Sequence, residues 1–177
     1  ALISMGLARS HAGPAWWAPW RPAIVPAVMR RLRILQPANG GFLEATPLTG
    51  FVAMSLAAAG LPGHPVVSDG CRFLGASQRL DGSWPIDTNL STWVTTLAVD
   101  ALRDGISDQD SMAVTDWLLG QQFLTRHPFT GAAPGGWGWT DLPGGVPDAD
   151  DTAGALLTLH TSGRRDAQTE RAVQAGL

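Results

Sequence analysis

A short motif recurs along the chain at a nearly constant interval. It consists of a glutamine, a glycine four residues later and an aromatic residue two positions further on, as in Gln36, Gly40 and Phe42. The second copy begins at Gln78, 42 residues later, and a third glutamine, Gln122, follows after another 44 residues. A period in this range is typical of arrays of helix pairs. The chain is therefore predicted to be built from stacked helix pairs.

Apolar residues recur at helical spacing on both sides of each motif. Each copy is therefore predicted to be an outer helix, a turn and an inner helix. The inner stretch Thr46 to Ala59 is apolar on nearly all sides, so we expect that helix to be buried. Asp87 or Thr88 is expected to cap the next inner helix. The expected elements are helices over 25–35, 46–59 and 152–160, one that Pro65 opens and the turn from Gln78 closes, and one from Asp87 or Thr88 to Leu102. A further helix begins at Ser107 and carries Trp117 and Leu118 before Gln122, and residues 171–177 form the first half of another outer helix.

The predicted organisation has two parts. Residues 1–22, rich in proline and tryptophan, are expected to form an irregular connecting segment. Residues 23–177 are expected to form about three helical-pair repeats, truncated at the C-terminus. The fold class is all-α. Because an array of this kind cannot bury its own ends, we expect this chain to be a fragment of a longer protein.

Composition excludes several classes of function. Only 15% of the residues are charged and the net charge is −3, without a basic block, so nucleic acid is not expected as a partner. The one cysteine, Cys71, allows no internal disulfide and is expected to be a small buried side chain. The four histidines lack the short spacings of metal ligands, so we expect neither a metal nor another cofactor. Trp93 and Trp117 are expected in the core.

Three carboxylates, Asp148, Asp150 and Asp151, fall within four positions just before a run of small and apolar residues. At a surface, such a stretch would simply begin a helix, because acidic residues suit its N-terminus. If it is buried, the like charges oppose one another's ionisation, and at least one pKa must rise. The residues alone leave both interpretations open.

The two motifs together resemble a known family. The spacing of Phe73, Leu74, Gln78, Gly82 and Trp84 is similar to the QW repeat of the squalene–hopene cyclase and oxidosqualene cyclase superfamily. The stretch 148–153 (Asp-Ala-Asp-Asp-Thr-Ala) resembles the DxDDTA motif of the squalene–hopene branch. Further similarities lie at 18–22, 87–88 and 134–137. The resemblance spans essentially the whole chain and corresponds to a central segment of a complete cyclase.

This resemblance implies a fold and a reaction. The fold would be part of an (α/α)6 barrel of alternating outer and inner helices. The reaction would be class II terpene cyclisation, which begins when an acid protonates a terminal alkene of a polyisoprenoid such as squalene, as in hopanoid biosynthesis. Asp150 would be the proton donor, and Asp148 and Asp151 its acidic partners. The histidine that pairs with the donor in this family would lie in a later repeat. The glutamines and aromatic residues of the repeats would be scaffold.

The resemblance also implies residues that contact the substrate. Trp139 takes the place of a cavity aromatic, and Asp87 matches an aspartate that heads an inner helix. Ile86 stands where the family often has tryptophan. Leu43 and Glu44 fall near the constriction through which substrate enters. No metal site is implied. The whole protein would attach to the cytoplasmic side of a membrane as a monotopic protein, and a homodimer is compatible with the resemblance.

Two other functions stay open. A bacterial class II diterpene cyclase shares the mechanism but acts on geranylgeranyl diphosphate, and a basic, magnesium-binding patch would favour it. A non-catalytic α/α repeat module would bind a lipid or a protein partner. In a module that has lost catalysis, the three acids would no longer be needed, whereas all of them are present here.

Overall fold

The computed structural model describes residues 1–13, 19–128 and 130–177, apart from the side chain of Asp104. The regular structure of these residues consists of helices, without strands, which confirms the all-α prediction. The chain divides into two compact units, residues 1–88 and residues 89–177. Each unit is built around its own core, and the two are described separately.

The prediction of an irregular segment over residues 1–22 is wrong for its first half. Helix α1 spans Leu2–His11, and Leu7 is buried in the core of the first unit. The prolines of this segment begin only at Pro14, so nothing in the preceding residues breaks a helix. Residues 14–18 lie outside the described part of the chain. Helix α2, Arg21–Leu35, has already begun at the end of the predicted segment.

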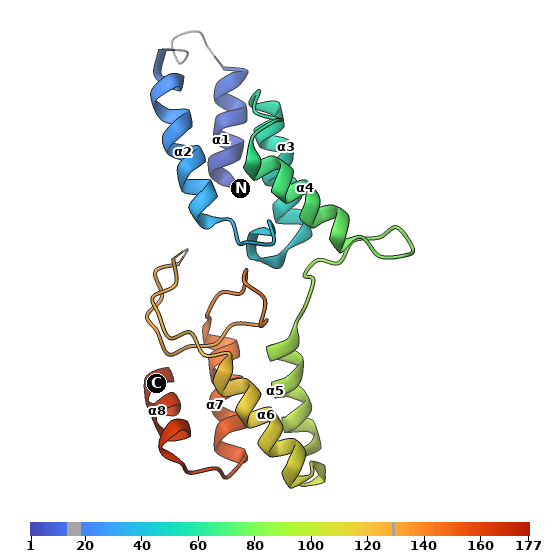
Figure 1. Cartoon of the computed structure of the whole chain (residues 1–177), viewed down its shortest axis with the longest axis vertical. Coiled ribbons are helices and arrows are strands. Elements are labelled where there is room, and N and C mark those ends of the chain that lie inside the picture. The colour runs from blue at the N-terminus through green and yellow to red at the C-terminus, as the bar shows by residue number, and fades with distance from the viewer. Residues whose placement is uncertain (14–18, 129) are drawn as a thin grey trace. The chain divides into compact units, whose positions relative to one another are not determined.

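The first unit is assembled around helix α3, Thr46–Ala58, which contacts both α1 and α4, Pro65–Ser77 (Figure 1). The His64 side chain caps α4 by accepting a hydrogen bond from the Val66 N–H at 3.2 Å. A short helix, η2, Phe42–Glu44, connects α2 with α3. The core consists of Leu7, Met29, Leu32, Phe42, Val52, Ala53, Leu56, Ala59, Val66 and Val67.

Helix α3 is not buried on all sides as predicted. Val52 and Leu56 are almost fully buried, whereas Phe51 and Met54 are 53% and 62% exposed. The neighbouring helices α1 and α4 cover part of its surface, and its remaining apolar residues are left on an open face. Cys71 is also exposed, contrary to the expectation that it is a buried side chain.

The second unit contains α5, Ser91–Leu102, α6, Asp108–Gly120, α7, Ala149–Thr161, and α8, Ala167–Gly176. A short helix, η3, Arg103–Gly105, follows α5. Helices α5 and α7 run side by side in the same direction, and α6 contacts both (Figure 1). The core consists of Leu118, Leu119, Trp137, Ala155, Leu159 and Ala172, and the half-buried Trp117 packs against it.

Small side chains determine which face of α5 meets α7. A Cβ atom added to Gly154 of α7 would lie only 3.0 Å from Thr96 Oγ1 of α5. Thr92 and Thr96 are therefore buried, while Trp93, Val94 and Leu97 are 41–56% exposed. The expectation that Trp93 lies in the core is wrong, because the closely packed face of α5 has room only for small residues.

Two of the repeated glutamines, Gln36 and Gln122, each connect their turn to a later helix of the same unit. Gln36 Nε2 donates to the Gly40 carbonyl at 3.1 Å and to the Val66 carbonyl of α4 at 3.0 Å. Gln122 Nε2 donates in the same way to Gly135 at 2.7 Å and to Ala172 of α8 at 2.9 Å. Two chain segments distant in sequence share one side-chain amide, so these glutamines have a structural role.

The tryptophans of the motif also make one repeated contact. Trp84 Nε1 donates to the Leu74 carbonyl at 2.7 Å, and Trp137 Nε1 donates to the Leu118 carbonyl, also at 2.7 Å. In both copies the accepting carbonyl lies four residues before the repeated glutamine. The sequence repeat is therefore a repeat of structure, in which the indole fixes the turn to the end of the preceding helix.

The glutamine contacts predict unequal losses of stability. Gln36 is 8% exposed and makes two inter-segment hydrogen bonds, whereas Gln78 makes one, to Gly82, at an exposed position. Gln36→Ala is expected to lower the free energy of unfolding by about 1–3 kcal/mol, because it leaves buried carbonyl groups without their hydrogen-bond donor. Gln78→Ala should cost less than about 1 kcal/mol. Urea denaturation followed by circular dichroism measures both, and equal losses would contradict the structural assignment.

Candidate active site

The acidic cluster lies at the N-terminus of α7. Asp148 is the N-cap residue, and its Oδ1 accepts a hydrogen bond from the Asp151 N–H at 2.8 Å. The Asp148 N–H donates to the Trp137 carbonyl at 3.1 Å, in an isolated antiparallel bridge. The cluster is thus held between a helix end and the turn of the third repeat, and the prediction that it begins a helix is confirmed.

The three carboxylates differ in exposure. Asp151 is 3% exposed, Asp148 is half-buried and Asp150 is exposed. Successive residues of a helix point about 100° apart, so Asp150 and Asp151 cannot both face the core. The resemblance implies that Asp150 is the proton donor, and burial would be needed to keep its carboxyl protonated. In the structure, the buried residue is the adjacent Asp151.

Burial has a direct electrostatic consequence for Asp151. Its pKa is raised from 3.8 to about 7, chiefly because burial disfavours the charged form. A hydrogen bond with the Asp148 side chain raises it further, as do the negative charges of Asp148 and Asp150. At neutral pH the protonated form of the Asp151 carboxyl is therefore well populated.

The raised pKa of Asp151 predicts how stability depends on pH. The folded protein holds this proton up to about pH 7, whereas the unfolded chain releases it near 3.8, so between these values the folded state binds more protons. Stability should therefore fall as pH rises from about 4 to about 7 and then level off. Asp151→Asn should remove this part of the dependence of stability on pH. Thermal melts of both proteins across this range test the prediction, which fails if their pH profiles are parallel.

Trp139 connects the cluster to helix α5. Its carbonyl accepts hydrogen bonds from the Thr92 and Trp93 N–H groups, at 3.1 and 3.2 Å, in the first turn of α5. Trp139 is half-buried. The segment 137–139 therefore contacts the start of α7 at one end and the start of α5 at the other, which brings Trp139 into the same site as the three acids.

Further contacts around this segment were missed by sequence reasoning. Asp141 and Ser91 exchange two hydrogen bonds, from Ser91 Oγ to Asp141 Oδ1 at 2.7 Å and from the Asp141 N–H to Ser91 Oγ at 3.1 Å. Thr152 Oγ1 accepts from the Trp137 N–H at 3.0 Å. The partners Ser91 and Asp141 are 50 residues apart, and no local pattern relates them.

Ile86 occupies the corresponding position in the second repeat. Its carbonyl accepts from the Thr46 N–H at the start of α3, at 3.1 Å, as the Trp139 carbonyl does at the start of α5. Both residues lie two positions after the aromatic residue of their turn, and Glu44 has this position in the first turn. Ile86 is 75% exposed. Ile86 and Trp139 therefore share one structural position, and Glu44 corresponds to them in sequence.

Glu44 does not lie at an open constriction within the first unit. Its side chain is fully buried, and both carboxylate oxygens accept from Asn39 Nδ2, at 2.8 and 3.0 Å. Thr88 Oγ1 donates to it at 3.1 Å. Leu43 and Glu44 both have a φ of 54°, a conformation that residues other than glycine rarely adopt. The hydrogen bonds to Glu44 hold this strained turn in place.

Asp87 does not head helix α5 as predicted. The helix begins at Ser91, whose N–H donates to Asn89 Oδ1 at 2.6 Å. Asp87 is half-buried and forms an isolated bridge with Ala45. Asn89 binds the start of the helix in place of Asp87. An asparagine side chain can accept a hydrogen bond from the N–H two residues later, which closes a turn.

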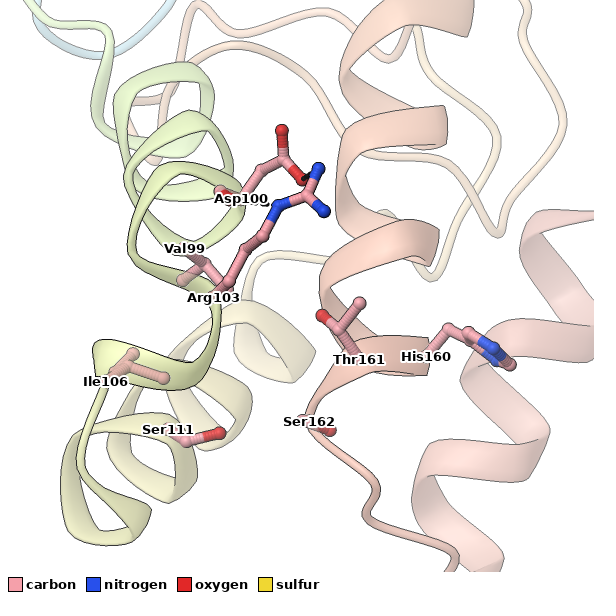
Figure 2. A pocket seen from close by; sticks show the side chains of 8 residues that line it. All are labelled: Val99, Asp100, Arg103, Ile106, Ser111, His160, Thr161 and Ser162. Carbon is pink, nitrogen blue, oxygen red and sulfur yellow. Dashed lines mark hydrogen bonds and ion pairs between the residues drawn. The ribbon is translucent and has the colours of Figure 1, made fainter.

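The largest pocket described in the second unit lies away from the acids. It has a volume of about 530 Å³ and is lined by Val99, Asp100, Arg103, Ile106, Ser111, His160, Thr161 and Ser162 (Figure 2). Arg103 pairs with Asp100 at 3.7 Å, and the His160 ring points away from both (Figure 2). The pocket contains none of the predicted site residues. Its arginine is already neutralised by a carboxylate.

Within the described residues, no cluster of three or more histidine, cysteine or acidic side chains could hold a metal ion. No helix in the same residues is long and apolar enough to cross a membrane. No protein-family model matches the chain, and a search of curated proteins finds no significant match. The assignment of function therefore rests on the residues and geometry given above.

Proposed function

We propose that this chain is a segment of a class II terpene cyclase, most similar to squalene–hopene cyclases, which starts a cyclisation by protonating an alkene. One observation carries the proposal: three carboxylates share one helix N-terminus, and one of them, Asp151, is buried with a pKa of about 7. A surface helix cap needs no buried acid. An enzyme that protonates an alkene, which is a very weak base, needs carboxylic acids that stay protonated.

The different exposures of the acids suit different roles in this reaction. A proton donor must touch the alkene, and the exposed Asp150 can do so, whereas Asp151 is almost completely enclosed. In the proposed step, the π electrons of the alkene form a bond to the Asp150 proton. The O–H bond breaks with its electron pair left on oxygen, and a carbocation forms at the more substituted carbon.

The cluster is arranged to hold the charge that this step creates on Asp150. The new carboxylate would lie in the first turn of α7, where the helix dipole favours negative charge. Asp151, when protonated behind it, would add no second negative charge next to the new carboxylate. Asp148 itself is bound to the Asp151 N–H, which fixes its orientation.

Apolar and aromatic side chains are exposed on α5, whose first turn is bound to the same turn that binds Asp148. Trp93 in the first turn of α5 is 41% exposed, and its N–H is bound to the Trp139 carbonyl. Aromatic faces stabilise cations without reacting with them. Val94 and Leu97 continue the open apolar face of α5. We propose that this face, with Trp139, contacts the polyisoprenoid chain.

The repeated helix pairs are consistent with part of an (α/α)6 barrel, in which α3, α5 and α7 would be inner helices and α2, α4, α6 and α8 outer helices. The repeated glutamine and tryptophan contacts support this proposal. Attachment to the cytoplasmic side of a membrane, and a homodimer, belong to the same proposal for the whole protein.

The test is an incubation of the protein, with any sequence that flanks residues 1–177 in its natural form, in detergent with squalene. Geranylgeranyl diphosphate serves as a second substrate. Gas chromatography–mass spectrometry should detect cyclic triterpenes from squalene. Product from the diphosphate alone would shift the assignment to the diterpene cyclases. Absence of product from both would overturn the proposal in favour of a binding module.

A further inference from the structure

The start of helix α5 is bound by the third turn rather than by a side chain of its own N-cap residue. That residue is Leu90, whose side chain has no atom that accepts a hydrogen bond. The first N–H groups of a helix have no partner within the helix. Here the Thr92 and Trp93 N–H groups both donate to the Trp139 carbonyl, at 3.1 and 3.2 Å. The main chain of Trp139 is therefore bound to α5 at its carbonyl oxygen.

A second contact with α5 lies two residues further along the chain. Ser91 Oγ donates to Asp141 Oδ1 at 2.7 Å, and the Asp141 N–H donates back to Ser91 Oγ at 3.1 Å. Asn89 Nδ2 donates to the same carboxylate oxygen at 3.4 Å. Because the serine hydroxyl both donates and accepts, it fixes the main chain and the side chain of Asp141 together.

Trp139 lies halfway between this contact and an anchor on helix α7. The anchor is Trp137, whose N–H donates to Thr152 Oγ1 at 3.0 Å and whose ring is fully buried. Gly138 leaves the segment no room to shift, because a Cβ atom there would lie 2.5 Å from the Val146 carbonyl oxygen. The direction of the Trp139 side chain is therefore determined by the contacts on both sides of it.

The contact between Asp141 and Ser91 is not needed for the core. Asp141 is exposed, and neither residue belongs to the core of either unit. Hydrogen bonds at exposed positions contribute little to global stability, because water replaces a lost partner. The main consequence of this contact is local: it fixes one end of the segment that carries Trp139.

We propose that Asp141 and Ser91 are positioning residues for Trp139, which hold its ring where it stabilises the carbocation. The inference rests on the proposed function for its catalytic meaning. A displaced ring stabilises the cation less, so that cyclisation ends early. It ends when a C–H bond next to the cation breaks, its electrons form an alkene and its proton passes to water. It also ends when a water oxygen binds the cationic carbon and releases a proton. Protonation by Asp150 is unaffected.

The products formed from squalene test this role in the protein with any sequence that flanks residues 1–177 in its natural form. Asp141→Ala should raise the ratio of partly to fully cyclised products by about two- to tenfold, the effect of one hydrogen bond. Asp141→Asn keeps an acceptor oxygen and should restore the ratio. Ser91→Ala should act like Asp141→Ala, with no further increase in the double variant. An unchanged ratio in folded Asp141→Ala, or equal ratios in the alanine and asparagine variants, would overturn the proposal.

Fluorine NMR of the same protein labelled with fluorotryptophan tests the positioning without any activity. The resonance that disappears in Trp139→Phe belongs to Trp139. It should shift in Asp141→Ala and return in Asp141→Asn, while the resonance of the buried Trp137 stays in place. If Asp141→Ala does not fold, Ser91→Ala takes its place in both tests. An unmoved Trp139 resonance would refute the positioning role. Absence of cyclase activity in the unaltered protein would refute the proposed function but not the NMR result.

Discussion

Asp150→Asn is expected to abolish cyclisation of squalene while leaving the fold intact. The amide has nearly the shape of the acid but no proton acidic enough for an alkene, and a general acid typically contributes about 10²–10⁴-fold to a rate. Because Asp150 is exposed and makes no contact in the cores of the two units, its replacement should not change the melting temperature appreciably. Product formation per unit time, measured by gas chromatography, should fall by roughly 10³-fold or more.

A matched control separates this effect from a general loss of charge. Asp100→Asn removes another exposed carboxylate, 75% exposed near the end of α5, and should leave turnover close to normal. If Asp150→Asn keeps normal turnover while Asp151→Asn loses it, the donor is Asp151. Normal turnover in both variants would contradict the role of the acidic cluster altogether.

Trp137→Ala is expected to cause the largest loss of stability of any single change considered for this chain. Trp137 is 0% exposed, lies in the core of the second unit and donates to the Leu118 carbonyl. Truncation of a buried tryptophan leaves a cavity and costs about 3–5 kcal/mol. Here it also removes a hydrogen bond next to the turn that binds Asp148. Guanidinium denaturation followed by circular dichroism should show the loss.

Trp84 provides a control at the equivalent position of the second repeat. Its Nε1 donates to the Leu74 carbonyl at the same distance of 2.7 Å, but the side chain is 49% exposed. Trp84→Ala should therefore cost only about 1 kcal/mol, mainly the hydrogen bond. Equal losses for the two variants would show that burial of Trp137 does not dominate, and would contradict the account of the core.

The helices were largely predictable because their signals are local. Apolar spacing and the turn residues Pro37 and Gly40 placed α2 with its C-terminal end at Leu35, and Pro65 marked the start of α4. Which faces are buried was not predictable in this way. Phe51 and Trp93 are apolar but exposed, because burial depends on what the neighbouring helices cover and on the small side chains that allow a close approach.

The candidate site was predictable in its residues but not in its geometry. The spacing of Asp148, Asp150 and Asp151 identified the cluster, and helix geometry then assigned burial to only one of the adjacent pair. The contacts of Trp139 with the start of α5 could not be read from the sequence. They join residues that are 46 and 47 positions apart, and they depend on how the third turn meets helix α5.

Glu44 shows the limit of residue-by-residue transfer from a family. The resemblance placed it near the constriction through which substrate would enter. In the structure, hydrogen bonds from Asn39 and Thr88 hold its carboxylate inside the first unit. A charged residue in a turn is usually exposed, and nothing in the local sequence signals that Thr88, 44 residues away, will bind it.

Cyclisation in D₂O tests the central claim most directly. If the protein starts the reaction by protonating an alkene from an aspartic acid whose proton exchanges with solvent, each cyclised molecule must gain a single carbon-bound deuterium from the enzyme. The account predicts a product from squalene with that deuterium on the carbon that was protonated, located by mass spectrometry and NMR. A cyclic product that contains no solvent deuterium would contradict protonation by the acidic cluster.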